Sequence, residues 1–153
     1  MKLSEHFSLS EFTKSQTAER RGIINHPEID HIANMKELCE NILEPVREEF
    51  GVTVINSGYR SKQLNEAIGG SSTSQHCKGE AADIEVPGVS NLEIAQWIVD
   101  NDLPFDQLIL EFYTEGKPSS GWVHVSYGAR KRGQVLTAAK RSGRTVYLEG
   151  INP

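Results

Sequence analysis

The sequence predicts an α+β fold, in which a small, largely antiparallel sheet carries the functional side chains and packs on helices. Two observations favour this class. A helical pattern with apolar residues three or four apart runs through residues 27–51, and a second begins at Ser90. Much of the rest consists of short segments with alternating apolar residues, separated by glycine, proline and serine. At 153 residues the chain is expected to form one domain, residues 1–153.

The N-terminal third is predicted to contain two helices. Ser8 and Glu11 have the spacing of a capping box, so a short helix is expected to begin there. Thr13–Asn25 is polar and is expected to be irregular. The main core helix is predicted to follow, with Pro27 in its first turn and a kink at Pro45.

The remaining elements are expected to be short. A helix is predicted over Ser61–Ile68, and a capping box at Ser90 predicts an amphipathic helix as far as Asp100. The expected strands are Val52–Ser57, Ala81–Val86, Phe105–Phe112, Trp122–Tyr127 and a final hairpin of Gln134–Ala138 with Arg144–Leu148.

Composition excludes several classes of protein. A formal charge of -5 argues against a general nucleic-acid binder, which needs a basic face to neutralise phosphates. No apolar run approaches the length of a membrane span, and residues 1–25 lack the apolar core of a signal peptide. We therefore expect no nucleic-acid or membrane partner, a monomer, and a chain that is cytoplasmic as synthesised. Cys39 and Cys77 do not form a disulfide framework, so a reducing compartment is expected.

One basic run departs from the acidic average. Arg130, Lys131 and Arg132 are consecutive, and further basic residues follow in the final hairpin. Two interpretations stay open: a solvated rim of the hairpin, or a contact with an anionic polymer or with substrate carboxylates.

Three residues have the composition of a catalytic zinc site. His76 is followed by Asp83 seven positions later and by the distant His124. Three protein ligands leave the fourth tetrahedral position of zinc free for water, which distinguishes a hydrolytic site from a closed structural one. Gly79 allows the backbone to turn between the first two ligands, so His76 is expected on a loop and Asp83 on the next strand.

The strand pattern places two of these ligands on one face. Asp83 alternates with Ala82 and Ile84, so it points away from the apolar face of its strand. His124 likewise alternates with Val123 and Val125. Both ligands are therefore predicted to lie opposite the core.

Together these motifs resemble the zinc D-alanyl-D-alanine peptidases, a group with cell-wall carboxypeptidases, phage endolysin peptidases and, more distantly, the hedgehog signalling domain. The shared pattern is Ser-x-His-x-x-Gly-x-Ala-x-Asp at residues 74–83, Trp-Val-His-Val at 122–125 and Ser-Gly-Tyr-Arg-Ser at 57–61. It runs from residue 7 to about residue 137. The resemblance implies the hedgehog/DD-peptidase fold and a zinc peptidase that cuts the peptide stems of peptidoglycan, as a carboxypeptidase or an endopeptidase. Such an enzyme would reach the cell wall after phage-type release or by another export route.

Three residues are assigned to the substrate. The resemblance implies that Arg60 lies at the active site, where its planar guanidinium suits a substrate carboxylate or the developing oxyanion. Ser74 is expected to bind substrate or to orient a ligand, although a turn serine would be equally ordinary there. Trp122 is assigned to substrate binding beside His124.

The general base is less clear from the sequence. Many relatives place a glutamate three residues before the final histidine, but this chain has Gly121 there. Glu111 is predicted to share the face of His124 on the neighbouring strand, so it is assigned as the base. Glu115 is the alternative, on a looser loop. Either glutamate could instead be a solvent-exposed charge of the hairpin without a catalytic role.

Two other functions stay open. One is a zinc-bearing binding module without activity, as in the hedgehog relatives. The other is a cysteine hydrolase that uses Cys77 with His124 as base, although it would leave Asp83 unexplained. His26 and His31 are not expected to bind metal, because five residues separate them along a helix.

Overall fold

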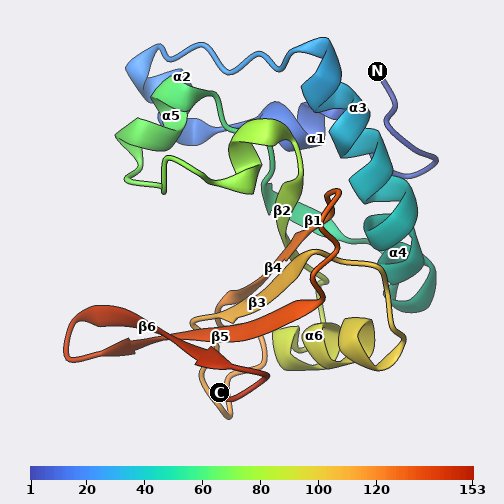
Figure 1. The fold of residues 1–153 in the computed structure, drawn as a ribbon, viewed down its shortest axis with the longest axis vertical. Coiled ribbons are helices and arrows are strands. Elements are labelled where there is room, and N and C mark those ends of the chain that lie inside the picture. Colours follow the sequence, from blue (N-terminus) through green and yellow to red (C-terminus); the bar gives the residue numbers. More distant parts are fainter.

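The computed structural model describes residues 1–153, which form a six-stranded sheet, six α-helices and two further helical segments (Figure 1). The helices are α1 (Leu9–Thr13), α2 (Gln16–Arg21), α3 (Ile29–Leu38), α4 (Glu44–Phe50), α5 (Lys62–Ala67) and α6 (Asn91–Asp100), with a π turn at Cys39–Leu43 and a 3-10 helix at Gln75–Lys78. The strands are β1 (Val54–Ser57), β2 (Ala81–Glu85), β3 (Gln107–Glu111), β4 (Trp122–Ser126), β5 (Gln134–Arg141) and β6 (Arg144–Glu149).

The sheet has the order β1-β2-β4-β3-β5-β6, and every neighbouring pair except β3 and β5 is antiparallel. The predicted α+β class and the largely antiparallel sheet are confirmed. The parallel pair was not predicted. It arises because β5 pairs with the outer edge of β3, and both of these strands run opposite to β4.

The apolar face of the sheet packs against the long helix and α6. Alternation along the strands directs one set of side chains into this core and leaves the other face for polar groups. The fully buried core side chains include Met35, Leu38, Ile42, Ile84, Ile94, Ile98, Leu108, Leu110, Val123 and Val125.

The long helix, which consists of α3, the π turn and α4 in succession, changes from α-helical to π-helical hydrogen bonding ahead of Pro45. Pro45 has no N–H and its ring crowds the carbonyl one turn earlier, so a regular α-helix cannot pass through it. The chain forms the π turn Cys39–Leu43 instead, in which the N–H of Glu44 bonds the carbonyl of Cys39. The predicted distortion therefore occurs as a π turn. Pro27 lies outside the helix, contrary to expectation, because Glu28 is the N-cap.

The prediction that Thr13–Asn25 is irregular was wrong, since this segment contains α2. Ser15 caps the helix by accepting a hydrogen bond from the N–H of Ala18 at 3.2 Å, and Gly22 ends it in the left-handed conformation. Ala18 is its one buried residue, so no apolar periodicity marked it.

None of the helices in the protein combines the length and the apolar character that crossing a lipid bilayer requires.

The final hairpin is longer than predicted and lies at one edge of the sheet. Ser142 and Gly143 join β5 to β6, both with positive φ, as a two-residue hairpin turn requires. The hairpin projects away from the helices (Figure 1). Most of β6 is exposed or half-buried, in contrast to the buried strands β2 and β4.

Candidate metal centre

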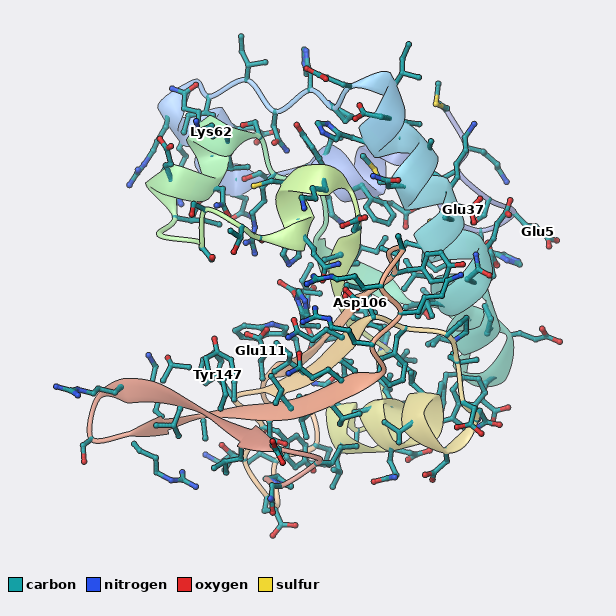
Figure 2. All side chains as sticks on the ribbon, in the orientation of Figure 1. Glu5, Glu37, Lys62, Asp106, Glu111 and Tyr147 are labelled. Atoms are coloured by element: carbon teal, nitrogen blue, oxygen red, sulfur yellow. The ribbon has the colours of Figure 1, made fainter.

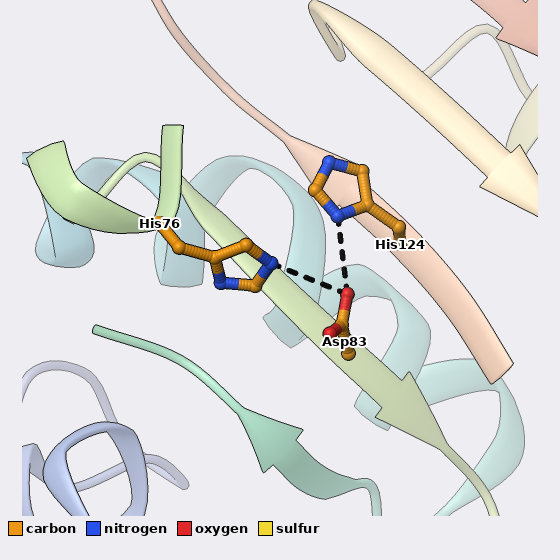
Figure 3. Close-up of side chains that lie close together, drawn as sticks. All are labelled: His76, Asp83 and His124. Carbon is orange, nitrogen blue, oxygen red and sulfur yellow. Dashed lines mark hydrogen bonds and ion pairs between the residues drawn. The ribbon is translucent and has the colours of Figure 1, made fainter. Parts of the chain in front are cut away.

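Three side chains from separate elements meet on the polar face of the sheet. His76 comes from the 3-10 helix, Asp83 from β2 and His124 from β4 (Figure 3). Asp83 and His124 are direct partners across the β2–β4 pair, so their side chains rise next to each other. All three residues are less than a tenth exposed. The structure thus brings together the three ligands predicted from the sequence.

The distances between these groups suit one tetrahedral ion. Asp83 Oδ1 lies 3.4 Å from His76 Nε2 and 3.1 Å from His124 Nδ1. Ligand atoms about 2.0–2.1 Å from a tetrahedral zinc are about 3.3 Å apart, which matches both separations. The donor set of two imidazoles and one carboxylate is also a usual zinc set. The residues present therefore fit the metal.

The backbone around His76 fixes which ring nitrogen faces the site. His76 Nδ1 lies 2.7 Å from the carbonyl oxygen of Gly58, which can only accept, so Nδ1 carries the proton. Nε2 is left unprotonated toward Asp83, as a metal ligand must be. Ser74 caps the 3-10 helix by accepting a hydrogen bond from the N–H of His76 at 3.2 Å. Gly79 ends it in the left-handed conformation, where a Cβ would overlap the carbonyl of His31.

The protonation states of His76 and Asp83 suit a metal site. Burial lowers the pKa of His76, so its imidazole stays neutral. Burial alone would raise the pKa of Asp83, but the two histidine rings outweigh it and hold this pKa well below its usual range. A neutral imidazole at His76 and an ionised carboxylate at Asp83 are the protonation states that a divalent metal requires.

Arg60 is held at the edge of this centre by groups that the sequence did not reveal. Its Nη2 lies 3.6 Å from Asp83 Oδ2, and its Nε donates to Ser57 Oγ at 3.2 Å. Asn65 accepts from Nη1 at 3.5 Å and donates to the carbonyl of Ser71 at 2.8 Å, so it links the arginine to the loop before His76. Asn65 is buried, which is the signal of its role, but burial cannot be read from a polar helix.

A second buried asparagine supports the same turn. Asn25 donates to the carbonyls of Thr13 and Tyr59 and accepts from the N–H of Ser61 at 2.6 Å. Its contacts fix the Gly-Tyr-Arg-Ser segment against the N-terminal part of the chain. Because its partners lie far away in the sequence, no local pattern identified it.

Glu111 lies on the face predicted for it, beside His124. Its Oε1 is 3.9 Å from His124 Nδ1, and burial together with the negative charge of Asp83 raises the pKa of Glu111 to about 7.

The structure also explains the departure from the family pattern at Gly121. Gly121 has a φ of +65°, and a Cβ there would overlap the carbonyl oxygen of Glu111. A glutamate at residue 121 therefore does not fit the hairpin that β3 and β4 form.

An open groove of about 930 Å³ passes over the three ligands. Polar residues form most of its lining, and Arg60, Ser74, Glu111 and Trp122 are among them. The Trp122 ring packs edge-on against Phe112, and its Nε1 has no hydrogen-bond partner. Glu115 does not line the groove. The assignment of Ser74 and Trp122 to substrate stays a prediction.

The basic run is anchored by a buried carboxylate. Asp106, which is fully buried, accepts from Arg132 Nε at 2.8 Å, from Arg130 Nη2 at 3.5 Å and from Gln75 Nε2 at 2.9 Å. The hydrogen bonds from Arg132 lower the pKa of Asp106 to about 2. Since Gln75 precedes His76, this cluster ties the loop after β4 to the 3-10 helix. Arg130 and Arg132 therefore have a structural role that the interpretation as a solvated rim did not include.

Two other candidates for chemistry are less favoured. Burial raises the pKa of Cys77, so its thiol stays protonated and is a poor nucleophile. His31 caps α3 through the N–H of Glu28 at 3.2 Å and lies beside the Tyr59 ring. It does not line the groove.

A sequence model of the family described as peptidase M15 matches residues 5–126. The chain belongs to the peptidase M15 family. This confirms the resemblance to the zinc D-alanyl-D-alanine peptidases and, with the observed fold, makes the protein a peptidase of that family. M15 peptidases are generally zinc-dependent, and the buried His-Asp-His group fits such a metal. A search of curated proteins found no match to this M15 peptidase.

Proposed function

We propose that this M15 peptidase hydrolyses amide bonds in the peptide stems of peptidoglycan, with one zinc ion held by His76, Asp83 and His124. The convergence of two imidazoles and one carboxylate in a buried cluster carries the proposal. Burying these polar groups without a metal lowers the stability of the fold, because desolvation disfavours a buried charge such as that of Asp83. The metal would offset that cost.

The zinc ion, when bound, supplies a positive charge that polarises the scissile carbonyl and favours ionisation of a water molecule. The residues of the chain do the rest. Glu111 accepts the proton of the attacking water and returns it to the leaving amine, because its carboxylate is beside His124 and lines the groove. Arg60, held by Ser57 and Asn65, presents its remaining N–H groups to the oxyanion or to a substrate carboxylate.

The polar groove supports a peptide substrate. A chain with many amide groups needs hydrogen-bonding partners along its length, and the groove offers them from several elements. Ser74 and Trp122 contact the residues on either side of the cleaved bond in this proposal. We expect the protein to work without nucleic-acid or membrane partners.

Digestion of purified cell-wall fragments tests the function. The zinc-loaded protein should release defined products, identified by mass, and a chelator should stop the reaction until zinc is restored. The masses would also separate loss of a terminal residue from internal cleavage. A protein that binds zinc but releases nothing would be a binding module, and activity that survives chelation would favour chemistry at Cys77.

A further inference from the structure

The β5–β6 hairpin extends the site face of the sheet beyond the part of the chain that the family model matches. That match ends at Ser126, the last residue of β4, whereas β5 and β6 span Gln134–Glu149. The two strands are nevertheless hydrogen-bonded into the same sheet as the three metal ligands. The hairpin is thus an addition to the matched core with a direct structural connection to it.

The strand register places one aromatic residue of this hairpin in line with Glu111. Glu111 pairs with Ala138 on β5, and Ala138 pairs with Tyr147 on β6. Residues that are direct partners across a sheet point to the same face. Tyr147 therefore rises on the face that carries Glu111 and His124, two strands beyond Glu111.

Tyr147 is exposed but lies over the groove. The residue is 59% exposed, and it lines the same groove as Asp83, Glu111 and His124. Figure 2 shows Tyr147 next to Glu111 on the open side of the sheet. The residue between them, Ala138, is small and buried, so no side chain rises to separate the ring from the catalytic end of the groove.

The neighbouring charge on the hairpin is already engaged. Lys140 Nζ donates to Thr145 Oγ1 at 3.0 Å and lies 5.6 Å from the centre of the Phe112 ring. Tyr147 is the residue of the hairpin that lines the groove, so the hairpin offers the groove an aromatic surface. A flat ring with a hydroxyl group suits the backbone and side chains of a peptide better than an anionic group.

We propose that Tyr147 is a specificity-determining residue, which binds the substrate peptide several residues away from the cleaved bond. The inference rests on the proposed function and adds a requirement for substrate length. Three strand spacings of about 4.8 Å separate β4 from β6, or about 14 Å. An extended peptide covers about 3.3–3.6 Å per residue, so about four residues are needed to reach Tyr147 from the site.

The test uses two series of peptides, in which one cleavable bond is extended by single residues on the amino side or on the carboxyl side. For the wild-type protein, kcat/KM should rise in one series once about four residues are present. Tyr147→Ala should remove that rise, a loss of about five- to tenfold, and leave the shortest substrates unaffected. Arg144→Ala, on the opposite face of β6, is the matched control and should keep the rise.

Binding without turnover provides a second readout. Calorimetric titration of a long, uncleavable peptide should give a Kd that Tyr147→Ala weakens by the same factor, while a short peptide binds both proteins equally. Equal kcat/KM for Tyr147→Ala and wild type on every peptide would overturn the inference but leave the peptidase intact. An equal loss on short and long peptides would also overturn it. A wild-type protein that cuts no peptide would instead contradict the proposed function.

A sugar ligand is the competing occupant. If the rise in kcat/KM appears only when disaccharide units are attached to the stem, and not with longer peptides, the ring binds glycan and the peptide subsite is wrong.

Discussion

The centre of the sheet and its C-terminal edge differ in almost every physical respect. On β2 and β4, Asp83 and His124 are buried and are fixed by strands on both sides. On β6, Tyr147 is exposed and has a neighbouring strand on one side only. The centre belongs to the segment that the family model matches, and the edge does not.

This difference indicates that the central strands and the edge strand have different functions. Groups that hold a metal and move protons need fixed positions, because small displacements cost large factors in rate. Groups that select a substrate can lie on a more mobile surface, because each contributes a smaller increment of binding. Substitutions at the centre should therefore change whether the reaction occurs, and substitutions at the edge should change which substrate is preferred.

The largest effect is expected from His76→Ala. Removal of a direct ligand should lower zinc affinity by more than the 10–100-fold typical of changes to outer hydrogen-bond partners, and activity should be lost with the metal. Metal content by atomic emission and turnover of wall fragments are the measurements. His26→Ala, an exposed histidine away from the cluster, is the control. Full zinc occupancy in His76→Ala at wild-type affinity would contradict the assignment.

Glu111→Gln should have the next largest effect. It keeps the size of the side chain but removes the proton acceptor, so kcat should fall by roughly 10²-fold or more while zinc binding and folding are retained. Kinetics on a wall peptide, with zinc content measured on the same sample, check this. Glu115→Gln is the matched control on the neighbouring loop. If that variant is inactive and Glu111→Gln is normal, the base lies on the loop.

Arg60→Lys should reduce kcat/KM by about tenfold or more without loss of zinc. Lysine keeps the charge but cannot reproduce the fork that Ser57 and Asn65 hold in place. Arg47→Lys, on α4 and distant from the groove, serves as the control. Unchanged kinetics for Arg60→Lys would make Arg60 a surface residue without a role in the reaction.

Asp106→Asn should lower stability more than activity. The change weakens the hydrogen bonds from Arg132 and Arg130, and we expect a loss of about 1–3 kcal/mol in the free energy of unfolding. Because the folded pKa of Asp106 is lowered to about 2, its contribution is fully present above its unfolded pKa of about 4. It is lost as the pH falls from about 4 through about 2. Urea denaturation of both proteins across this range should show their difference shrinking in acid, and a constant difference would contradict the assignment.

The smallest effect concerns the motion of the wild-type protein. Amide hydrogen exchange should be slowest in β2 and β4 and fastest in β6, because local opening of an exposed edge strand disrupts few buried contacts. Mass spectrometry of exchanged peptides can compare these strands directly. Equal protection of β6 and β4 would remove the distinction between a rigid centre and a mobile edge.

The sequence predicted the parts of the molecule that local patterns control. Alternation placed Asp83 and His124 on one face, and the register of β2 with β4 confirms it. Capping residues located helices α1 and α6, since Ser8 and Ser90 are their N-caps. The short helix α2 was missed because it has a cap but almost no apolar side.

The remaining features depend on contacts between distant segments. Asn65 and Asn25 hold the arginine turn, but nothing in their neighbours in the sequence distinguishes them from surface asparagines. The bonds from Gln75 and Arg132 to Asp106 join three separate parts of the chain. The parallel pairing of β3 and β5 depends on which strand edge β5 joins, which only the assembled sheet reveals.

The fit of Gly121 against Glu111 has a consequence for how such an enzyme can change over time. A carboxylate at residue 121 and the present hairpin geometry are mutually exclusive, since the side chain would meet the neighbouring backbone. A mutational route from one arrangement to the other cannot begin with Gly121→Glu alone, because that step disrupts the hairpin before any new acid is useful. The backbone of the β3–β4 hairpin has to shift as well, so a glutamate at residue 121 is tolerated only together with other changes. With Glu111 proposed as the base, an enzyme that carries this carboxylate at residue 121 therefore differs from the present one by more than a single substitution.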